Sequence, residues 1–422
     1  MYFKQDIHQL SVITKSKYLI MTINERIFKI KGVVQNYAWG GASYIPNLVG
    51  YKNEENKPCA EYWMGAHPSA PSTFQLNGQS GALNQLIQSD LIGTLTQPIA
   101  DRFGELPYLF KVLDVNDMLS IQVHPSKEEA QKGFDKEEAE SIPIKAPHRN
   151  YKDRNHKPEV MVALSDFWLL HGFKKKSALE KSLEENQDLK ILLPLFKKDG
   201  LRALYQFIME MDQLDVDTLL IPLIKREIRQ KLDGKLTKHD PGWWVVKLYQ
   251  GKELNEYIDR GIFSIYFFNI VQINPGEAIF QKAGVPHAYL EGQNIELMAN
   301  SDNVLRGGLT PKHVDVTELM KHTLFEEIVP EIMMGNPGRI GEKIYPCPVP
   351  DFGISKIDLN AGSIYSASAE SFEIILVTEG GALVNNSIVL KRGEVIALLP
   401  GAEYQLSASG NCTLFKAFVP VL

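Results

Sequence analysis

Hydrophobic and polar positions follow two different patterns along the chain. From Arg26 to about Phe173, short apolar runs rich in β-branched and aromatic residues are interrupted by Gly and Pro, which is typical of β-strands. Between residues 174 and 260 the apolar positions recur at helical spacing instead, as in Leu201, Leu204, Tyr205, Ile208 and Met211. Strand-like sequence resumes at IFSIYFFNIVQINPGEAIF and continues to the C-terminus. The pattern predicts a mainly β protein with an α-helical insert over residues 174–260.

A short repeat links the two strand-rich parts. Gly276-Glu277-Ala278-Ile279 is followed by Gly284, and Gly393-Glu394-Val395-Ile396 is followed by Gly401, at the same interval of eight residues. Glycine is favoured where a tight turn needs a backbone conformation that strains other residues, so matched glycines indicate matched hairpins. We therefore expect two related β-barrels in one chain.

Length and composition are those of a globular protein with more than one domain. The chain has 422 residues, of which 44% are hydrophobic and 23% charged, and this length favours two or three domains. No apolar run approaches the roughly 18 residues of a membrane-spanning helix, and the first twenty residues lack the apolar core of a secretion signal. We expect residues 1–20 to be an N-terminal extension, because regular patterning starts only at Met21.

Charge and cysteine content narrow the choice of partners and compartment. The formal net charge of −6, without a long Lys/Arg run, argues against a nucleic-acid partner. The three cysteines, Cys59, Cys347 and Cys412, are far apart and lack the spacing of a disulfide framework or a thiolate metal site. A reducing compartment fits this usage, and we expect a cytoplasmic protein without a membrane partner.

Three segments carry candidate metal ligands. In SIQVHP, Gln122 and His124 are two residues apart and therefore point to the same face of a strand. Glu159 in HKPEV precedes the apolar run VMVAL, and His287 in AGVPHAY follows a Gly-Val-Pro turn. Two imidazoles with oxygen donors and no thiolate suit zinc or a similar divalent ion at a catalytic site. Spacing alone leaves four alternative ligands, namely His67, His148, His156 and His171.

Several longer motifs resemble the type I phosphomannose isomerases. They stand in the family's order and at roughly its spacing through most of the chain: QNYAWGG, AEYWMGAHPSAPS, LPYLFKVLDVNDMLSIQVHPSKEEA, NHKPEVMVAL and PHAYLEGQNIELMANSDNVLRGGLTPKHVDV. The resemblance implies a cupin (jelly-roll) catalytic domain, interrupted by the helical domain and followed by a second cupin-like β domain. We accordingly expect a catalytic domain at 21–173 and 261–329, a helical domain at 174–260 and a C-terminal domain at 330–422.

The resemblance also implies roles for particular residues. It implies one zinc ion per chain, bound by residues that match Gln122, His124, Glu159 and His287. Arg306 in NVLRGG matches the arginine that the family treats as its active-site residue. Positions associated with the substrate phosphate match Ser120 and Lys312, and others that line the pocket match Lys157, Tyr289, Glu296 and Asp302. The implied reaction is the reversible isomerisation of mannose 6-phosphate and fructose 6-phosphate, and we expect the enzyme to be a monomer.

This reaction moves a proton between adjacent carbons through an enediol, so it needs a base and a positive partner for the developing oxyanion. A zinc ion can polarise the carbonyl, and Arg306 can add hydrogen-bonded positive charge. Glu296 is the preferred proton carrier, and Asp302, Lys157 and Tyr289 remain alternatives. Structural roles also stay open, because Arg306 could bind only phosphate, Lys312 could be a solvated loop lysine, and Glu296 could pair with a lysine.

Two other functions compete with this one. A cupin oxygenase with iron in place of zinc is disfavoured by the glutamine ligand and by the pair Arg306 and Lys312, which suit a phosphorylated sugar. A non-catalytic sugar-phosphate-binding protein is expected to lose a metal ligand or Arg306, and this chain keeps them all.

The C-terminal barrel is expected to differ in chemistry from the first. The repeat places Tyr404 where His287 stands, eleven residues after the first glycine of each copy, and no histidine follows His322. A neutral tyrosine is a poorer zinc ligand than an imidazole. We therefore predict that this barrel binds no metal and performs no chemistry.

Overall fold

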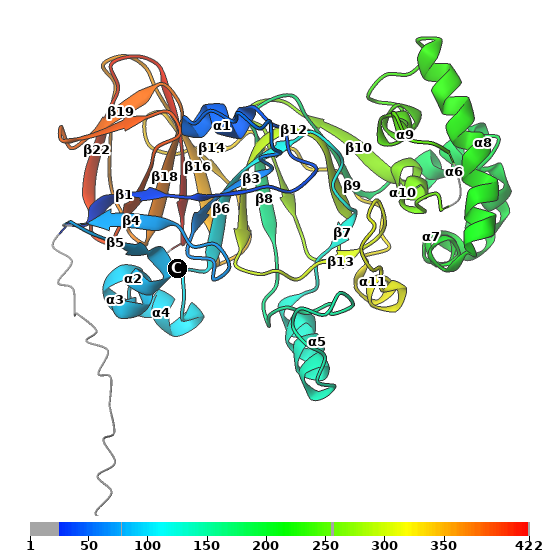
Figure 1. Ribbon diagram of the computed structural model, residues 1–422, viewed down its shortest axis with the longest axis horizontal. Helices are drawn as coiled ribbons and strands as arrows, with labels where there is room; N and C mark the ends of the chain where they lie inside the picture. Colours follow the sequence, from blue (N-terminus) through cyan, green and yellow to red (C-terminus); the bar gives the residue numbers. More distant parts are fainter. Residues whose placement is uncertain (1–24, 77, 255–256, 421–422) are drawn as a thin grey trace, which may run out of the picture.

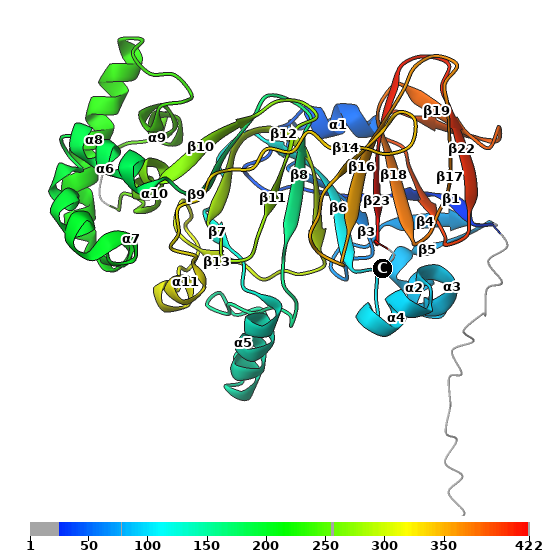
Figure 2. The same cartoon turned by 180° about the vertical axis from the view of Figure 1, so that it is seen from behind.

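The computed structural model describes residues 25–76, 78–254 and 257–420. In these residues the chain forms two β-barrels that lie side by side, with a layer of helices on the far flank of the central barrel (Figure 1). The view from behind shows the same order of helical layer, central barrel and C-terminal barrel (Figure 2). The expected extension, residues 1–20, lies outside the described residues.

The central barrel is a ten-stranded antiparallel sheet. Its strands are β2 (Val33–Gln35), β3 (Glu61–Gly65), β6 (Tyr108–Val115), β7 (Gln122–Val123), β8 (Glu159–Ala163), β9 (Phe167–Phe173), β10 (Phe268–Ile273), β11 (Ala278–Gln281), β12 (His287–Ala299) and β13 (Leu305–Arg306). The main path runs β10-β9-β12-β6-β3-β2, while β8 and β7 also pair with β12, β11 pairs with β8, and β13 pairs with β7. Strand β12 is the longest, at 13 residues, and pairs with four neighbours. Its first residue, His287, therefore lies where several strand ends meet.

The C-terminal barrel combines a nine-stranded and a four-stranded sheet. The larger sheet has the order β14-β15-β16-β23-β18-β21-β1-β4-β5, with bounds β1 (Ile27–Lys31), β4 (Thr73–Leu76), β5 (Gln79–Ala82), β14 (Asn336–Pro337), β15 (Glu342–Tyr345), β16 (Gly353–Leu359), β18 (Glu373–Glu379), β21 (Val395–Leu398) and β23 (Cys412–Phe418). The smaller sheet has the order β17-β22-β19-β20, with bounds β17 (Ile364–Ser368), β19 (Gly381–Val384), β20 (Ile388–Lys391) and β22 (Glu403–Ser407).

Three N-terminal strands complete the larger sheet of the C-terminal barrel. Strand β1 pairs with β21 on one side and with β4 on the other. Its inward residues, Phe28 and Ile30, are buried in the core shared with the C-terminal strands. The sheet boundary thus does not follow the expected boundary near residue 330, because the apolar face of β1 packs against partners about 370 residues away.

Most helices form a layer on one flank of the central barrel or lie below the two barrels, and the short α1 lies at the upper edge (Figure 1). They are α1 (Tyr44–Val49), α2 (Leu83–Ser89), α3 (Leu91–Leu95), α4 (Gln97–Phe103), α5 (Lys127–Ala139), α6 (Lys176–Glu185), α7 (Leu193–Glu210), α8 (Gln213–Leu232), α9 (Pro241–Tyr249), α10 (Gly261–Phe267) and α11 (Val316–His322), with a 3₁₀ turn at Lys190–Leu192. Helices α6–α9 fall within the predicted helical segment. The prediction that strands resume at Ile262 was wrong, because Gly261–Phe267 forms α10 and β10 begins only at Phe268. Leu204, Tyr205 and Ile208 of the predicted apolar stripe are buried in the core of this layer. None of the helices in the described residues is both long and apolar enough to cross a membrane.

The fold class predicted from the sequence is confirmed. Strands outnumber helices, the two β-barrels are present, and the helical insert follows β9. The matched glycines also behave alike, because Gly276 and Gly393 have φ values of 84° and 81°, and Gly284 and Gly401 have 81° and 82°. These left-handed values favour glycine, so the repeat marks equivalent turns in the two barrels.

Candidate active site

Three buried side chains meet inside the central barrel. His124 follows β7, Glu159 begins β8 and His287 begins β12. The Nε2 atoms of His124 and His287 lie 3.4 Å from Oε1 and Oε2 of Glu159, respectively. One ligand atom from each residue lies within 4.8 Å of the other two, and it is the only such group of three in the described part of the chain. All three side chains are almost fully buried.

Antiparallel pairing explains why residues so far apart in sequence converge here. His287 pairs with Gln122 of β7 across one edge of β12, and Gln122 pairs with Arg306 of β13 on its other side. Strand β8 pairs with a later part of β12, where Glu159 is the register partner of Met298. Side chains two residues apart on a strand share a face, so the side chain of Gln122 lies on the same face as that of His124.

The donor set fits a metal ion. Nδ1 of His124 lies 2.8 Å from the carbonyl oxygen of Asn303, and Nδ1 of His287 lies 3.0 Å from that of Val285. A carbonyl oxygen only accepts, so both imidazoles carry hydrogen on Nδ1 and present a lone pair on Nε2. Nε2 of His124 is buried without a hydrogen-bond partner. Burial lowers the pKa of His124 to about 4, which keeps the ring neutral as a metal ligand requires.

Glu159 is held as a carboxylate. Nζ of Lys157 lies 3.0 Å from Oε1 of Glu159. Burial by itself raises the pKa of Glu159, but the positive charge of Lys157 and the contact with His124 hold that pKa well below its usual range. The site therefore offers one negative oxygen donor between two imidazole nitrogens, the set that zinc prefers at catalytic sites.

A second buried charge cluster lies on β3, β6 and β12. Nζ of Lys111 lies 2.9 Å from Oε1 of Glu296 and 3.7 Å from Oε2 of Glu61, and the indole of Trp63 donates a hydrogen bond to Glu61. Burial raises the pKa of Glu296 against the opposing charge of Lys111. The hydroxyl of Tyr289 is buried without a hydrogen-bond partner. The pairing of Glu296 with a lysine, left open by the sequence, is therefore present.

Lys111 was not singled out by the sequence analysis. It stands in YLFKVLDV, a run in which every residue is buried. A lysine within a continuous apolar strand needs a buried partner, and this is the signal that could have identified it. Its partner Glu296 is 185 residues away, so the sequence contains no local pattern that pairs them.

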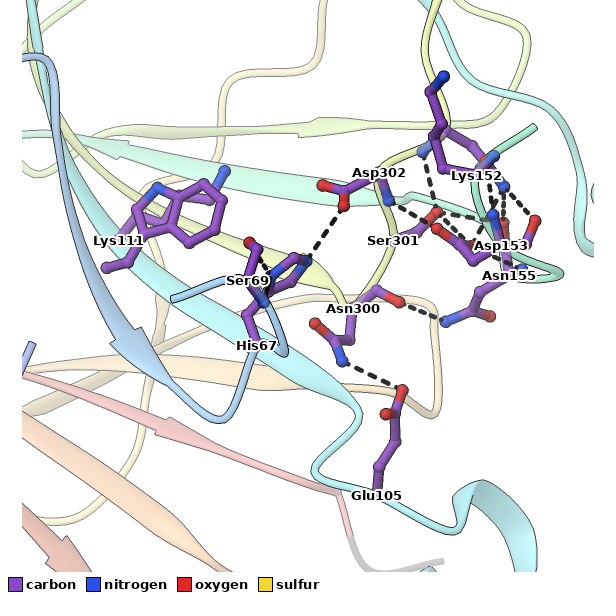
Figure 3. A network of polar contacts seen from close by, with 12 residues as sticks. His67, Ser69, Glu105, Lys111, Lys152, Asp153, Asn155, Asn300, Ser301 and Asp302 are labelled. Carbon is purple, nitrogen blue, oxygen red and sulfur yellow. Dashed lines mark hydrogen bonds and ion pairs between the residues drawn. The ribbon is translucent and has the colours of Figure 1, made fainter. Parts of the chain in front are cut away.

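Asp302 lies on the loop between β12 and β13, and its carboxylate faces His67 (Figure 3). The backbone amide of Asp302 donates to Oδ2 of Asp153 at 2.8 Å, and its own Oδ2 lies 3.5 Å from Nε2 of His67. Contact with His67 holds the pKa of Asp302 below its usual range. His67 receives a hydrogen bond at Nδ1 from the backbone amide of Ser69, so Nε2 carries the hydrogen that faces Asp302. Asp302 is thus fixed as a carboxylate.

Two lysines lie close enough to Arg306, the last residue of β13, for its charge to affect them. Burial lowers the pKa of Arg306, and burial together with the charge of Arg306 lowers that of Lys312. Burial also lowers the pKa of Lys152, and the charge of Arg306 lowers it further. Ser120 precedes Gln122 by two residues and is half-buried. Lys152, which the sequence analysis did not select, therefore belongs with the predicted Arg306 and Lys312.

The alternative histidines have other environments. His171 pairs with His287 across the sheet, but its Nδ1 lies 2.8 Å from Oε1 of Gln281 and it falls outside the three-residue group. His148 is exposed, and His156 contacts Asp351 of the C-terminal part. His67 contacts Asp302, as described above.

A cupin-like barrel with a buried His/Glu/His group defines a metal-binding protein of the cupin class, and comparison with known proteins gives its family. The family model described as phosphomannose isomerase type I, catalytic domain, matches residues 27–176. The mannose-6-phosphate isomerase of Salmonella typhimurium is 37% identical over 401 residues, covering 92% of this chain and 99% of the relative. That of Bos taurus is 34% identical and covers 93% of this chain and 98% of the relative. The chain belongs to the type I phosphomannose isomerase family.

Solved structures support the same assignment. The crystal structure of mannose 6-phosphate isomerase from Salmonella typhimurium bound to substrate, fructose 6-phosphate, and zinc has a TM-score of 0.82 and 34% identity. It covers 94% of this chain and 100% of that chain. A zinc-bound holo structure of mannose 6-phosphate isomerase matches with a TM-score of 0.82 and 33% identity. The family predicted from the sequence motifs is confirmed.

Proposed function

We propose that this chain interconverts mannose 6-phosphate and fructose 6-phosphate, with one zinc ion held by His124, Glu159 and His287 and by Gln122 beside them. The observation that carries the proposal is the pair of Nε2 lone pairs directed at the Glu159 carboxylate, one of them buried without a partner. Such an arrangement is costly in a protein core unless a cation completes it. The relatives that cover nearly the whole chain carry this activity in their names.

When bound, zinc supplies a Lewis acid that polarises the sugar carbonyl. The residues of the chain provide the rest of the chemistry. Isomerisation removes a proton from one carbon and returns it to its neighbour through an enediol, while negative charge develops on an oxygen. Arg306 pairs in register with Gln122, so the two side chains share a face of the sheet, and the guanidinium is proposed to stabilise that charge.

Proton transfer is assigned to the buried carboxylate Glu296. Lys111 holds one of its oxygens at 2.9 Å, which orients the carboxylate, and burial raises its pKa toward the range useful for a base. Tyr289, whose buried hydroxyl has no partner, can donate to the substrate or to Glu296. Lys157 and Asp302 are the alternative proton carriers, and the charge of Lys157 acts on Asp302.

The substrate phosphate is assigned to the cationic side of the pocket. Within the described residues, Arg306 and Lys312 have no carboxylate within ion-pair distance, although Arg306 is more than half-buried. The charge of Arg306 lowers the pKa of Lys312, so this side of the pocket attracts a dianion, and a phosphate held there orients the reacting carbons. Ser120 can add a hydroxyl donor, and Lys152 adds a third positive charge.

A coupled assay tests the function directly. Fructose 6-phosphate formed from mannose 6-phosphate is measured in the purified protein, after chelation, and after return of zinc. We expect activity to disappear on chelation and to return with zinc, and unphosphorylated mannose to be a very poor substrate. Full turnover by metal-free protein, or equal turnover of mannose and its 6-phosphate, would refute the proposal.

We further propose that the enzyme works as a cytoplasmic monomer. Every residue assigned to the site belongs to one chain, and all three cysteines are free thiols. Light scattering on the purified protein at assay concentrations is expected to give one mass near 47.6 kDa. A stable dimer mass would contradict the monomer.

A further inference from the structure

The loop that leads into β8 carries two groups of the site. Lys157 stands on this loop, two residues before Glu159, and the two side chains form an ion pair at 3.0 Å. Glu159 in turn lies 3.4 Å from both imidazoles of the metal group. A displacement of residues 155–158 would therefore move a pocket lysine and a metal ligand together.

One side of this loop is fixed by the central barrel itself (Figure 3). The side-chain amide of Asn303 donates to the backbone carbonyl oxygen of Asn155 at 2.8 Å, and the side-chain amide of Asn155 donates to the backbone carbonyl oxygen of Asn300 at 3.1 Å. The backbone amide of Asn155 also donates to Asp153 at 2.9 Å. These bonds tie the start of the loop to the segment that carries Asp302, but none of them involves His156.

The other side is fixed by the C-terminal part of the chain. Nε2 of His156 lies 3.0 and 3.1 Å from the two carboxylate oxygens of Asp351, which stands just before β16. Asp351 is 1% exposed, and His156 is its only hydrogen-bond or ion-pair partner among the described residues. A buried carboxylate with one partner is strongly bound to it, because its charge would otherwise be left without compensation.

We infer that Asp351 is a positioning residue of the active site, contributed by the C-terminal part of the chain. It acts through His156, which neighbours Lys157 in the chain and so positions the lysine that forms the ion pair with Glu159. A carboxylate can only accept, so Nε2 of His156 carries hydrogen, and the ring is held in one tautomer and one orientation. This inference rests on the proposed roles of Lys157 and Glu159.

Attachment of the two barrels does not need this contact. A continuous apolar core joins them, and the hydroxyl of Tyr108 donates to the carbonyl oxygen of Phe372 at 3.0 Å. The hydroxyl of Tyr345 donates to that of Gly276 at 2.7 Å. Since neither hydrogen bond involves His156 or Asp351, removal of the Asp351 carboxylate should leave the barrels packed while it frees His156.

A double-mutant cycle separates positioning from docking. The variants are D351A, D351N, H156A and D351A/H156A, with D358A as the control, because Asp358 lies on β16 and pairs with Lys356 at the surface. We expect D351A to lower kcat/KM for mannose 6-phosphate about 10- to 100-fold, as for other groups that orient metal-site residues. D351N should recover part of the loss, since its amide oxygen still accepts from Nε2. D358A should stay within about twofold of the parent.

The decisive outcome is the behaviour of the double variant. If Asp351 acts only through His156, D351A/H156A loses no more activity than H156A alone, and zinc passes to a chelator faster in D351A than in D358A. Losses that multiply in the double variant, or D351A activity within about twofold of the parent, overturn the inference. If D351A does not fold, D351N and D351N/H156A decide in the same way. Absence of isomerase activity in the parent would instead contradict the proposed function.

Discussion

Glu159 and Glu373 occupy the same place in the two barrels. Glu159 begins β8 and pairs with the last residue of β11, and Glu373 begins β18 and pairs with the last residue of β21. Strands β11 and β21 lie within the two copies of the sequence repeat. In each copy the amide of the first glycine donates to the carbonyl oxygen four residues after the glutamate, from Gly276 to Ala163 at 2.8 Å and from Gly393 to Val377 at 2.7 Å. The two carboxylates are therefore equivalent by backbone register.

The other ligand positions can be matched in the same way. The amide of Gly284 donates to the carbonyl oxygen of His124 at 2.9 Å, and that of Gly401 donates to Ala369 at 2.7 Å. His287 pairs with Gln122, two residues before His124. Its counterpart in β22, Tyr404, likewise pairs with Ala367, two residues before Ala369. The positions of Gln122, His124, Glu159 and His287 are thus held in the C-terminal barrel by Ala367, Ala369, Glu373 and Tyr404.

Different side chains on this shared frame give different interiors. In the C-terminal barrel the hydroxyl of Tyr404 donates to Glu373 at 2.9 Å, and burial raises the pKa of Glu373 to about 7. Lys416, in the strand position that corresponds to Glu296, lies 2.9 Å from Glu342. Lys416 and Glu373, whose pKa is raised, therefore occupy the region where the central barrel has Glu159, whose pKa is lowered, between two imidazoles. The capacity to bind a metal therefore depends on the side chains at these positions and not on the barrel fold.

The largest effect expected from this comparison is at His287. H287A should lower kcat about 1,000-fold or more, because the Lewis acid contributes several kcal/mol and one of its nitrogen donors is gone. Y404F, at the equivalent position, should retain kcat within about twofold. Steady-state assays of the two variants side by side check this, and a loss of activity in Y404F would break the comparison.

Arg306 and Lys312 should differ in the kinetic parameter that they change. R306A is expected to lower kcat by about 100-fold and to raise KM, since its charge is proposed to act on the transition state. K312A should raise KM by about 10-fold with kcat preserved, because a charged hydrogen bond to phosphate is lost in ground and transition state alike. Full Michaelis curves measure both, and an unchanged R306A enzyme would contradict the assignment.

The charge cluster of the C-terminal barrel should matter for stability alone. K416M leaves the buried Glu342 with hydrogen bonds but without its charged partner, and should lower the free energy of unfolding by about 3 kcal/mol. Zinc content and kcat should remain those of the parent at temperatures where the variant is folded. Thermal unfolding with parallel zinc analysis tests this, and loss of zinc from K416M would show that the two interiors are coupled.

The smallest effect expected is a pH dependence at Glu373. Its folded pKa of about 7 lies above the ordinary glutamate value, so the stability it contributes is full below about pH 4.5 and falls as pH rises toward 7. Lys416, Tyr404, Glu342 and Glu370 are the charged or titratable groups that act on it. E373Q mimics the protonated form, so its unfolding temperature should match the parent near pH 5 and exceed it near pH 8. Equal differences at both pH values would contradict the raised pKa.

Local signals predicted the parts of the fold that depend on local physics. Strand and helix periodicity predicted the order of elements, and the matched glycines predicted equivalent turns because only glycine adopts those φ values without strain. The ligand roles came from family motifs and stay a prediction, although the structure brings His124, Glu159 and His287 together. The contacts of Lys111 with Glu296 and of His156 with Asp351 span 185 and 195 residues, and no short-range pattern encodes such pairs. Register across the sheets creates them, as it places β1 in the C-terminal sheet.

The most direct test of the account is the zinc content of the intact protein, measured together with turnover, in the parent chain and in H124A. His124 has no metal-binding counterpart, since Ala369 occupies its place in the C-terminal barrel. The account predicts one tightly bound zinc per chain in the parent, about none in H124A, and loss of activity in proportion to the lost zinc. A tightly bound zinc that survives in H124A, or activity in zinc-free protein, would contradict it.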